Sequence, residues 1–113
     1  MDIKISKNDD NIYLVKLSGE MDLYSSEQLK ELIMKIIANK IERFIIDLNN
    51  IDGINSAGIG ALISVFSTLK KLNCPLVIIA AEGEALRALE VTRLKGYFSI
   101  ARTLEEALAL GRE

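Results

Sequence analysis

The stretch "RFIIDLNNIDGINSAGIGALISVF", from Arg43 to Phe66, changes its hydrophobic pattern halfway and so decides the fold class. Its first part, Arg43 to Leu48, is a short continuous apolar run, which predicts a strand buried on both faces. After a loop around Ser56, apolar residues recur at helical spacing up to about Leu72. A buried strand followed by an amphipathic helix is the repeating unit of an α/β sheet.

The sequence on either side repeats this alternation. Strands at 3–6 and 12–18 flank the polar turn "NDDN", which predicts a hairpin. Further segments predict a helix over 25–40, a strand over 76–81, a helix over 83–94, a short strand over 97–100 and a closing helix over 104–111. The order β-β-α-β-α-β-α-(β)-α predicts one α/β domain over residues 1–113, with a mixed, mostly parallel sheet of four to five strands and about four helices.

Two of the predicted helices carry a capping signal. A hydroxyl residue followed three positions later by Glu or Gln has the spacing of a capping box, in which each side chain bonds the other's backbone N–H. The pairs with this spacing are Ser25 with Gln28, and Thr103 with Glu106. The first pair predicts that Ser25 is the N-cap of the helix over 25–40.

Composition excludes several classes of function. Half of the residues are hydrophobic, which is enough for a core. The 14 Lys and Arg nearly balance the 16 Asp and Glu and form no basic run, which argues against a nucleic-acid partner. The absence of histidine excludes Ser-His-Asp and Cys-His catalysis and the usual zinc sites, and a lone cysteine, Cys74, excludes an intramolecular disulfide.

The distribution of apolar residues predicts a soluble, cytoplasmic protein with no membrane contact. The first ten residues lack the basic start and apolar stretch of a signal peptide. No apolar run approaches the roughly 18 residues that a transmembrane helix needs.

The glycines after the central strand resemble part of a dinucleotide-binding fingerprint. Gly58 and Gly60 lie at the start of a helix, and Glu82 follows roughly 20 residues later at a strand end. Two features oppose this interpretation. Ile63 occupies the third small position, and about seven residues separate the predicted strand from Gly58, where the fingerprint has a tight turn. A small nucleotide-binding or enzymatic α/β domain therefore stays as an alternative only.

The acidic residues suggest two further sites, and each has a simpler explanation. Asp9 and Asp10, with Asp47 on a parallel strand, resemble a phospho-acceptor arrangement, but the pair falls in the hairpin turn and is explained as solvated turn residues. A metal or acid–base cluster would form only if four acidic side chains came together in space, and their spacing in the sequence does not require this. Acidic residues before helices also commonly serve as caps. The members of such a cluster would be Glu20, Asp22, Asp47 and Asp52.

Ser56 has two interpretations that the local sequence leaves open. It is either the N-cap of its helix or the first helical residue behind an Asn55 cap. The small residues Ala57, Gly58 and Gly60 around it would let another protein's backbone approach closely. A phosphoryl group on Ser56 would sit at a helix N-terminus, which tolerates an anion, and would change a docking surface without breaking the fold.

Two segments resemble the STAS-domain family and, within it, the bacterial anti-sigma factor antagonists. "LSGEMDLYSSEQL" (17–29) is similar to the family's strand–loop–helix entry, with a Gly-Glu-x-Asp pattern that ends at Asp22. "IDLNNIDGINSAGIGAL" (46–62) is similar to its signature, a strand and a short loop before Asp-Ser-Ser/Ala-Gly opens a helix. The late "TLEEALA" also suits the family's closing helix, so the resemblance covers nearly the whole chain.

The resemblance implies a fold with helices mainly on one face of the sheet and a partner-switching role. The unmodified protein would bind an anti-sigma factor and so free a sigma factor. That anti-sigma factor, often a serine kinase, would phosphorylate Ser56 and release itself, and a phosphatase would reset the switch. ATP would belong to the kinase, so no cofactor is expected here. Asp22, Tyr24 and Ser25 would lie near Ser56 on the docking surface.

The match has one departure, and the family admits a second role. The signature aspartate is Asn55 here, which keeps the capping shape but removes a negative charge beside the acceptor. The alternative within the family is a STAS subunit of a lipid-transport ATPase complex, in which the same surface would be a permanent subunit contact.

Overall fold

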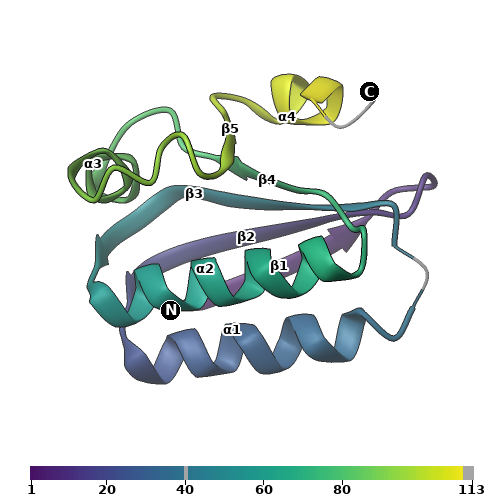
Figure 1. Cartoon of the computed structure of the whole chain (residues 1–113), viewed down its shortest axis with the longest axis horizontal. Coiled ribbons are helices and arrows are strands. Elements are labelled where there is room, and N and C mark those ends of the chain that lie inside the picture. The colour runs from purple at the N-terminus through teal and green to yellow at the C-terminus, as the bar shows by residue number, and fades with distance from the viewer. Residues whose placement is uncertain (40, 111–113) are drawn as a thin grey trace.

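In the computed structural model, which describes residues 1–39 and 41–110, the strands form one mixed sheet (Figure 1). They are β1 (Asp2–Lys7), β2 (Ile12–Met21), β3 (Arg43–Ile54), β4 (Leu76–Ile79) and β5 (Ser99–Ala101), and they lie in that order across the sheet. The β1–β2 pair is antiparallel and the other pairs are parallel. The predicted α/β class and mostly parallel sheet are confirmed.

The helices cover the two faces of the sheet unequally. They are α1 (Leu23–Ile36), α2 (Ser56–Lys71), α3 (Glu84–Val91) and α4 (Leu104–Leu110). In Figure 1, α1 and α2 lie side by side on one face and α4 lies on the other. The larger apolar core joins α1, α2 and α3 to the sheet, and a smaller cluster on the second face includes Ala107 of α4. Helices therefore lie mainly on one face, as the family resemblance implies.

The predicted hairpin is confirmed, and a side chain holds its turn. The Asn8 carboxamide oxygen accepts hydrogen bonds from the backbone N–H groups of Asp10 at 2.9 Å and Ile12 at 3.0 Å. Asn11 takes a left-handed φ of 60°, which asparagine tolerates better than most residues. Asp10 is thus an exposed turn residue.

All five strands differ from the prediction in at least one boundary: β1 is one residue longer at each end, and β4 ends at Ile79 rather than at residue 81. β2 extends to Met21 and β3 to Ile54, because the two strands keep pairing past the apolar runs that marked them, through two register shifts. Because the residues of these extensions are largely polar, the pattern of apolar residues did not predict them. β5 covers Ser99–Ala101 rather than 97–100. Two helices also end earlier than predicted: α1 ends at Ile36 rather than at residue 40, and α3 ends at Val91 rather than at residue 94. Residues 40 and 111 themselves lie outside the described residues.

The predicted start of the first helix was wrong by one turn. Asp22, not Ser25, is the N-cap, and Gln28 takes no part in a capping box. The Asp22 carboxylate accepts from the Ser25 N–H at 2.9 Å, and the Ser25 hydroxyl accepts from the Asp22 N–H at 2.9 Å. Serine replaces the usual Glu or Gln as the third helical residue, so the box keeps the standard spacing with different residue types. Within the described residues, no helix is both long and apolar enough to cross a membrane.

The parallel pairing of β2 and β3 brings two helix starts together. Met21 and Ile54 are register partners at the last rung of the ladder, and the residue after each is the N-cap of its helix. We call this end of the parallel strands the carboxyl edge, and the end that carries Ile12 and Arg43 the amino edge.

Candidate functional site at the carboxyl edge

Asn55 is the N-cap of α2, which resolves the two interpretations of Ser56. The Asn55 side-chain oxygen accepts from the Gly58 N–H at 3.1 Å, and its carbonyl accepts the first helical bond, from Ile59, at 3.1 Å. The Asn55 N–H in turn donates to the Met21 carbonyl at 3.3 Å, which ties the start of α2 to the end of β2. Ser56 is therefore the first helical residue, exposed and not needed for capping.

The two glycines at the start of α2 have different environments. A Cβ on Gly58 would lie 2.7 Å from the Ile54 Cγ1, 3.0 Å from the Met21 Cβ and 3.1 Å from the Met21 carbonyl oxygen. Gly58 is buried, so it lets α2 dock closely on the strand ends. A Cβ on Gly60 would meet nothing within 4 Å, and Gly60 is exposed. Only Gly60 is open to a partner's backbone.

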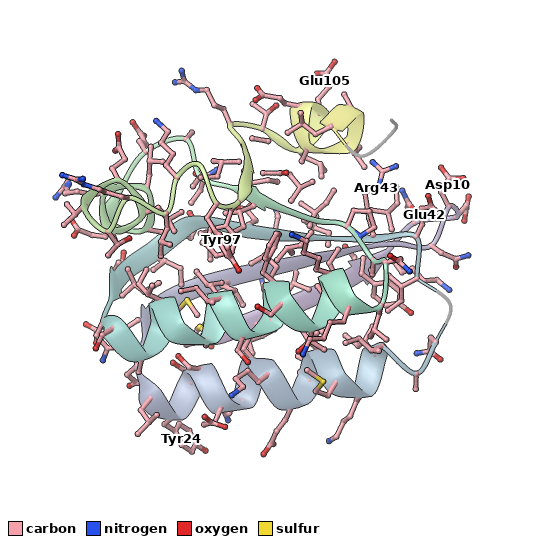
Figure 2. All side chains as sticks on the ribbon, viewed as in Figure 1. Asp10, Tyr24, Glu42, Arg43, Tyr97 and Glu105 are labelled. Atoms are coloured by element: carbon pink, nitrogen blue, oxygen red, sulfur yellow. The ribbon has the colours of Figure 1, made fainter. Side chains whose placement is uncertain are left out.

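The start of α1 lies beside the start of α2 and carries exposed apolar side chains. Leu23 is 65% exposed and Tyr24 is 73% exposed (Figure 2). Ser25, by contrast, is 3% exposed and its hydroxyl is engaged with Asp22. Ser25 therefore stabilises the start of α1, while Leu23 and Tyr24 face outward.

The carboxyl edge carries exposed acidic side chains. The two segments that lead into its helix starts, 17–29 and 44–69, contain no lysine or arginine. Glu20, Asp22 and Asp52 are exposed there. The N–H of Ser25, and then its hydroxyl, hold the pKa of Asp22 below its ordinary value by stabilising the carboxylate. The Asp22 cap is therefore charged at neutral pH.

The structure does not assemble the dinucleotide fingerprint. Gly58 and Gly60 lie inside α2 rather than in a turn before it. The expected gap of about seven residues between the strand and Gly58 was wrong, because β3 runs to Ile54 and only three residues separate Ile54 from Gly58. The fingerprint fails instead because its glycines are helical and Ile63 fills the third small position.

The acidic residues do not form the phospho-acceptor or metal sites that the sequence suggested. Asp47 lies within β3, opposite Lys16 of β2, while Asp9 and Asp10 belong to the hairpin turn at the other edge. Among residues 1–39 and 41–110, no group of three His, Cys, Asp or Glu side chains is placed to hold a metal ion.

Sequence reasoning missed two residues that shape the molecule. Leu23 looked like a loop residue, yet it begins α1 and faces outward. The Asp-x-x-Ser spacing of Asp22 and Ser25 was the available signal for this helix start. Arg43 was predicted only as the first residue of a strand, and it is 5% exposed. An arginine at the head of an apolar run carries no signal of burial, because arginine is rarely buried.

Comparison with known proteins agrees with this geometry. The STAS domain family model matches residues 4–107. The anti-sigma-B factor antagonist of Staphylococcus aureus is 27% identical over 86 residues, which are 76% of this chain and 80% of that protein.

Two solved structures share the fold. An anti-sigma factor antagonist from Mycobacterium paratuberculosis superposes with a TM-score of 0.86 at 24% identity, over 99% of this chain and 94% of the other. The phosphorylated form of the Bacillus cell fate determinant SpoIIAA superposes with a TM-score of 0.74 at 18% identity, over 98% and 100% of the two chains.

Proposed function

Because the chain belongs to the STAS-domain family, we propose that it is an anti-sigma factor antagonist that docks its partner at the carboxyl edge. The name of the S. aureus relative supports this role. The observation that carries the proposal is the pairing of β2 with β3 to their ends, which sets the starts of α1 and α2 side by side. Ser56 and the exposed Leu23 and Tyr24 thus lie at neighbouring helix starts.

Ser56 is the proposed phosphorylation site. It is exposed at the first helical position, and Asn55 has already taken the capping role. Ala57 follows it, so Ser56 is the only hydroxyl residue among positions 55–58. The existence of a phosphorylated form of SpoIIAA, a protein of the same fold, supports the idea that this fold accommodates the modification.

A phosphoryl group on Ser56 has a defined electrostatic environment. The first N–H groups of a helix have no intrahelical partner, and Asn55 accepts only from that of Gly58. The N–H groups of Ser56 and Ala57 therefore remain for the phosphate, together with the positive end of the helix dipole. Neither carboxyl-edge segment supplies a lysine or arginine to cover it. The phosphate stays accessible, so a phosphatase can remove it.

The partner contact is expected to use apolar anchors on a small-residue surface. Leu23 and Tyr24 supply exposed area, and Gly60 leaves room for a partner's backbone. Ser25 and Gly58 are buried and act by fixing the two helix starts. A phosphate of roughly two negative charges beside these anchors must be desolvated in the complex, which opposes docking. This gives the switch its direction.

The experiment is phosphorylation by the cognate anti-sigma factor kinase with ATP, followed by intact-mass measurement. We expect one phosphate on the wild type, none on Ser56→Ala, and one on the matched control Ser64→Ala, which removes a hydroxyl two turns along the same helix. Equal phosphate on wild type and Ser56→Ala would refute the site. Stable binding with no phosphate on any form would favour the permanent-subunit role instead.

A further inference from the structure

The C-terminal end of α2 borders a hollow at the amino edge, roughly 20 Å along the helix from Ser56. The hollow has a volume of about 340 Å³. Its apolar lining comes from Phe66 of α2 and from Cys74, Pro75 and Leu76, where the chain turns from α2 into β4 (Figure 1). The hollow therefore lies at the opposite end of α2 from the proposed docking surface.

A lysine lies at this hollow, on the same face of α2 as Phe66. Lys70 follows Phe66 by four residues, so the two side chains are neighbours on the helix. The Lys70 Nζ lies 6.0 Å from the centroid of the Phe66 ring, at the limit of a cation–π contact. Both residues line the hollow. The ammonium is therefore placed beside the aromatic wall of the hollow.

Other aromatic rings fix the position of this wall. The Phe66 ring centroid lies 4.9 Å from that of Tyr97 and 5.3 Å from that of Phe98, which it meets edge to face. Phe98 is itself buried. Because these contacts already hold the Phe66 ring, little further ordering is needed when a ligand packs against it.

Lys70 supplies the charge of the hollow. Among the described residues that line it, Lys70 is the only one with a charged side chain. The ion pairs within residues 1–39 and 41–110 do not include Lys70. Burial raises the pKa of the Cys74 thiol, and the Glu42 carboxylate raises it further, so this thiol is uncharged at neutral pH. The hollow thus combines one positive charge with a largely apolar lining.

We propose that this hollow binds an aromatic carboxylate, with its ring against Phe66 and Pro75 and its carboxylate at the Lys70 ammonium. The apolar lining favours a ring, because burying apolar surface is favourable and a polar body would lose water without gaining partners. A cationic ligand would meet repulsion from Lys70, and an uncharged one would not use its charge. The volume is at the lower end of small-molecule pockets, which suits a fused pair of rings.

The test uses 2-naphthoate as the probe, with 2-naphthamide as its uncharged analogue and acetate as the charged group alone. Each is titrated into the whole chain while NMR follows the amides of Asn73 and Cys74, and those of Ser56 and Ala57 at the other end of α2. We expect saturable shifts at Asn73 and Cys74 with naphthoate, and none at Ser56 and Ala57. Naphthamide should bind about fivefold more weakly, as expected for a partly exposed ion pair, and acetate should not saturate. No saturable shift with naphthoate, or equal affinity for naphthamide or acetate, would overturn the proposal.

Two neighbouring lysines allow a matched pair of variants. Lys70→Gln removes the charge at the hollow and should weaken naphthoate about fivefold while leaving naphthamide unchanged. Lys71→Gln removes an exposed charge from the same last turn of α2, outside the residues that line the hollow, and should leave both affinities unchanged. Unchanged naphthoate affinity in Lys70→Gln, or an equal loss in Lys71→Gln, would contradict the assignment.

Discussion

The carboxyl and amino edges of the sheet are ends of the same strands and helices, yet they differ in chemistry. The carboxyl edge carries Glu20, Asp22 and Asp52 and has no lysine or arginine in its two segments. The other ends of α1 and α2 carry basic residues, which are Lys35, Lys70 and Lys71. Helix dipoles account for part of this division, because cations stabilise C-termini and an anionic cap stabilises an N-terminus.

The dipole does not account for all of it. Glu20 and Asp52 lie on strands rather than on helices, so no helix end requires their charge. Leu23 and Tyr24 are apolar and exposed beside them. The carboxyl edge thus exposes apolar and acidic side chains, whereas the amino edge carries a buried arginine, Arg43. The two ends of the same strands therefore differ in whether their charged side chains are exposed or buried.

The largest expected effect concerns the packing that forms the carboxyl edge. Gly58→Ala should destabilise the protein by about 1–3 kcal/mol, because its methyl group would overlap Ile54 and Met21. Gly60→Ala, two residues along, should instead stabilise by about 0.5–1 kcal/mol, since the site is open and alanine favours a helix. Urea denaturation of both variants measures the difference. Equal free energies of unfolding would show that α2 does not need its close approach.

A comparable effect on binding, with the fold retained, is expected from charge at the acceptor. Ser56→Asp should weaken the complex with the anti-sigma factor by about 1–3 kcal/mol, because the charge must be desolvated at the contact. Calorimetry gives the affinity, and circular dichroism checks that the fold is intact. An unchanged affinity would place the interface elsewhere.

A smaller effect is expected at the cap between the two helix starts. Asn55→Ala should cost about 1 kcal/mol of stability, since the Gly58 N–H loses its acceptor. Asn55→Asp should gain about 0.3–1 kcal/mol from the helix dipole and restore the family's usual charge beside Ser56. Thermal or urea unfolding ranks the three proteins. A loss of stability in Asn55→Asp would show that the surrounding acids outweigh the dipole.

The smallest effect is a pH dependence at the neighbouring cap. The pKa of Asp22 lies below its ordinary value of 3.8 in the folded protein, because Ser25 stabilises the carboxylate. This contribution is full above pH 3.8 and is lost as pH falls through the lower, folded pKa. Asp22→Asn should therefore lose less stability than the wild type between pH 5 and pH 2, as urea midpoints would show. Equal losses of stability in the two proteins over this pH range would show that Asp22 does not cause the pH dependence.

Much of the fold was predictable because its core segments have strong periodic patterns. The apolar run at Arg43–Leu48 and the helical spacing after Ser56 identified the central strand and α2. The ends of β2 and β3 were not predictable, because Asn50 and Gly53 continue the strand through backbone pairing rather than side-chain pattern. Pairing of this kind depends on the partner strand, which local sequence does not describe.

The candidate site was predictable to a similar degree. The signature motif pointed to Ser56, but it could not decide between Ser56 and Asn55 as the cap, since both residues have capping side chains. It also did not distinguish Gly58, which is needed for packing, from Gly60, which is open. That distinction depends on how closely β2 approaches α2, which is a property of the assembled sheet.

Docking at the carboxyl edge can be tested by comparing two exposed tyrosines. Tyr24 lies at the carboxyl edge and is 73% exposed, while Tyr97 lies near the middle of the molecule, before β5, and is 44% exposed (Figure 2). The measurement is the calorimetric affinity of Tyr24→Ala and Tyr97→Ala for the anti-sigma factor. We expect a loss of about 2 kcal/mol for Tyr24→Ala and an unchanged affinity for Tyr97→Ala. Equal losses, or a loss confined to Tyr97→Ala, would contradict it.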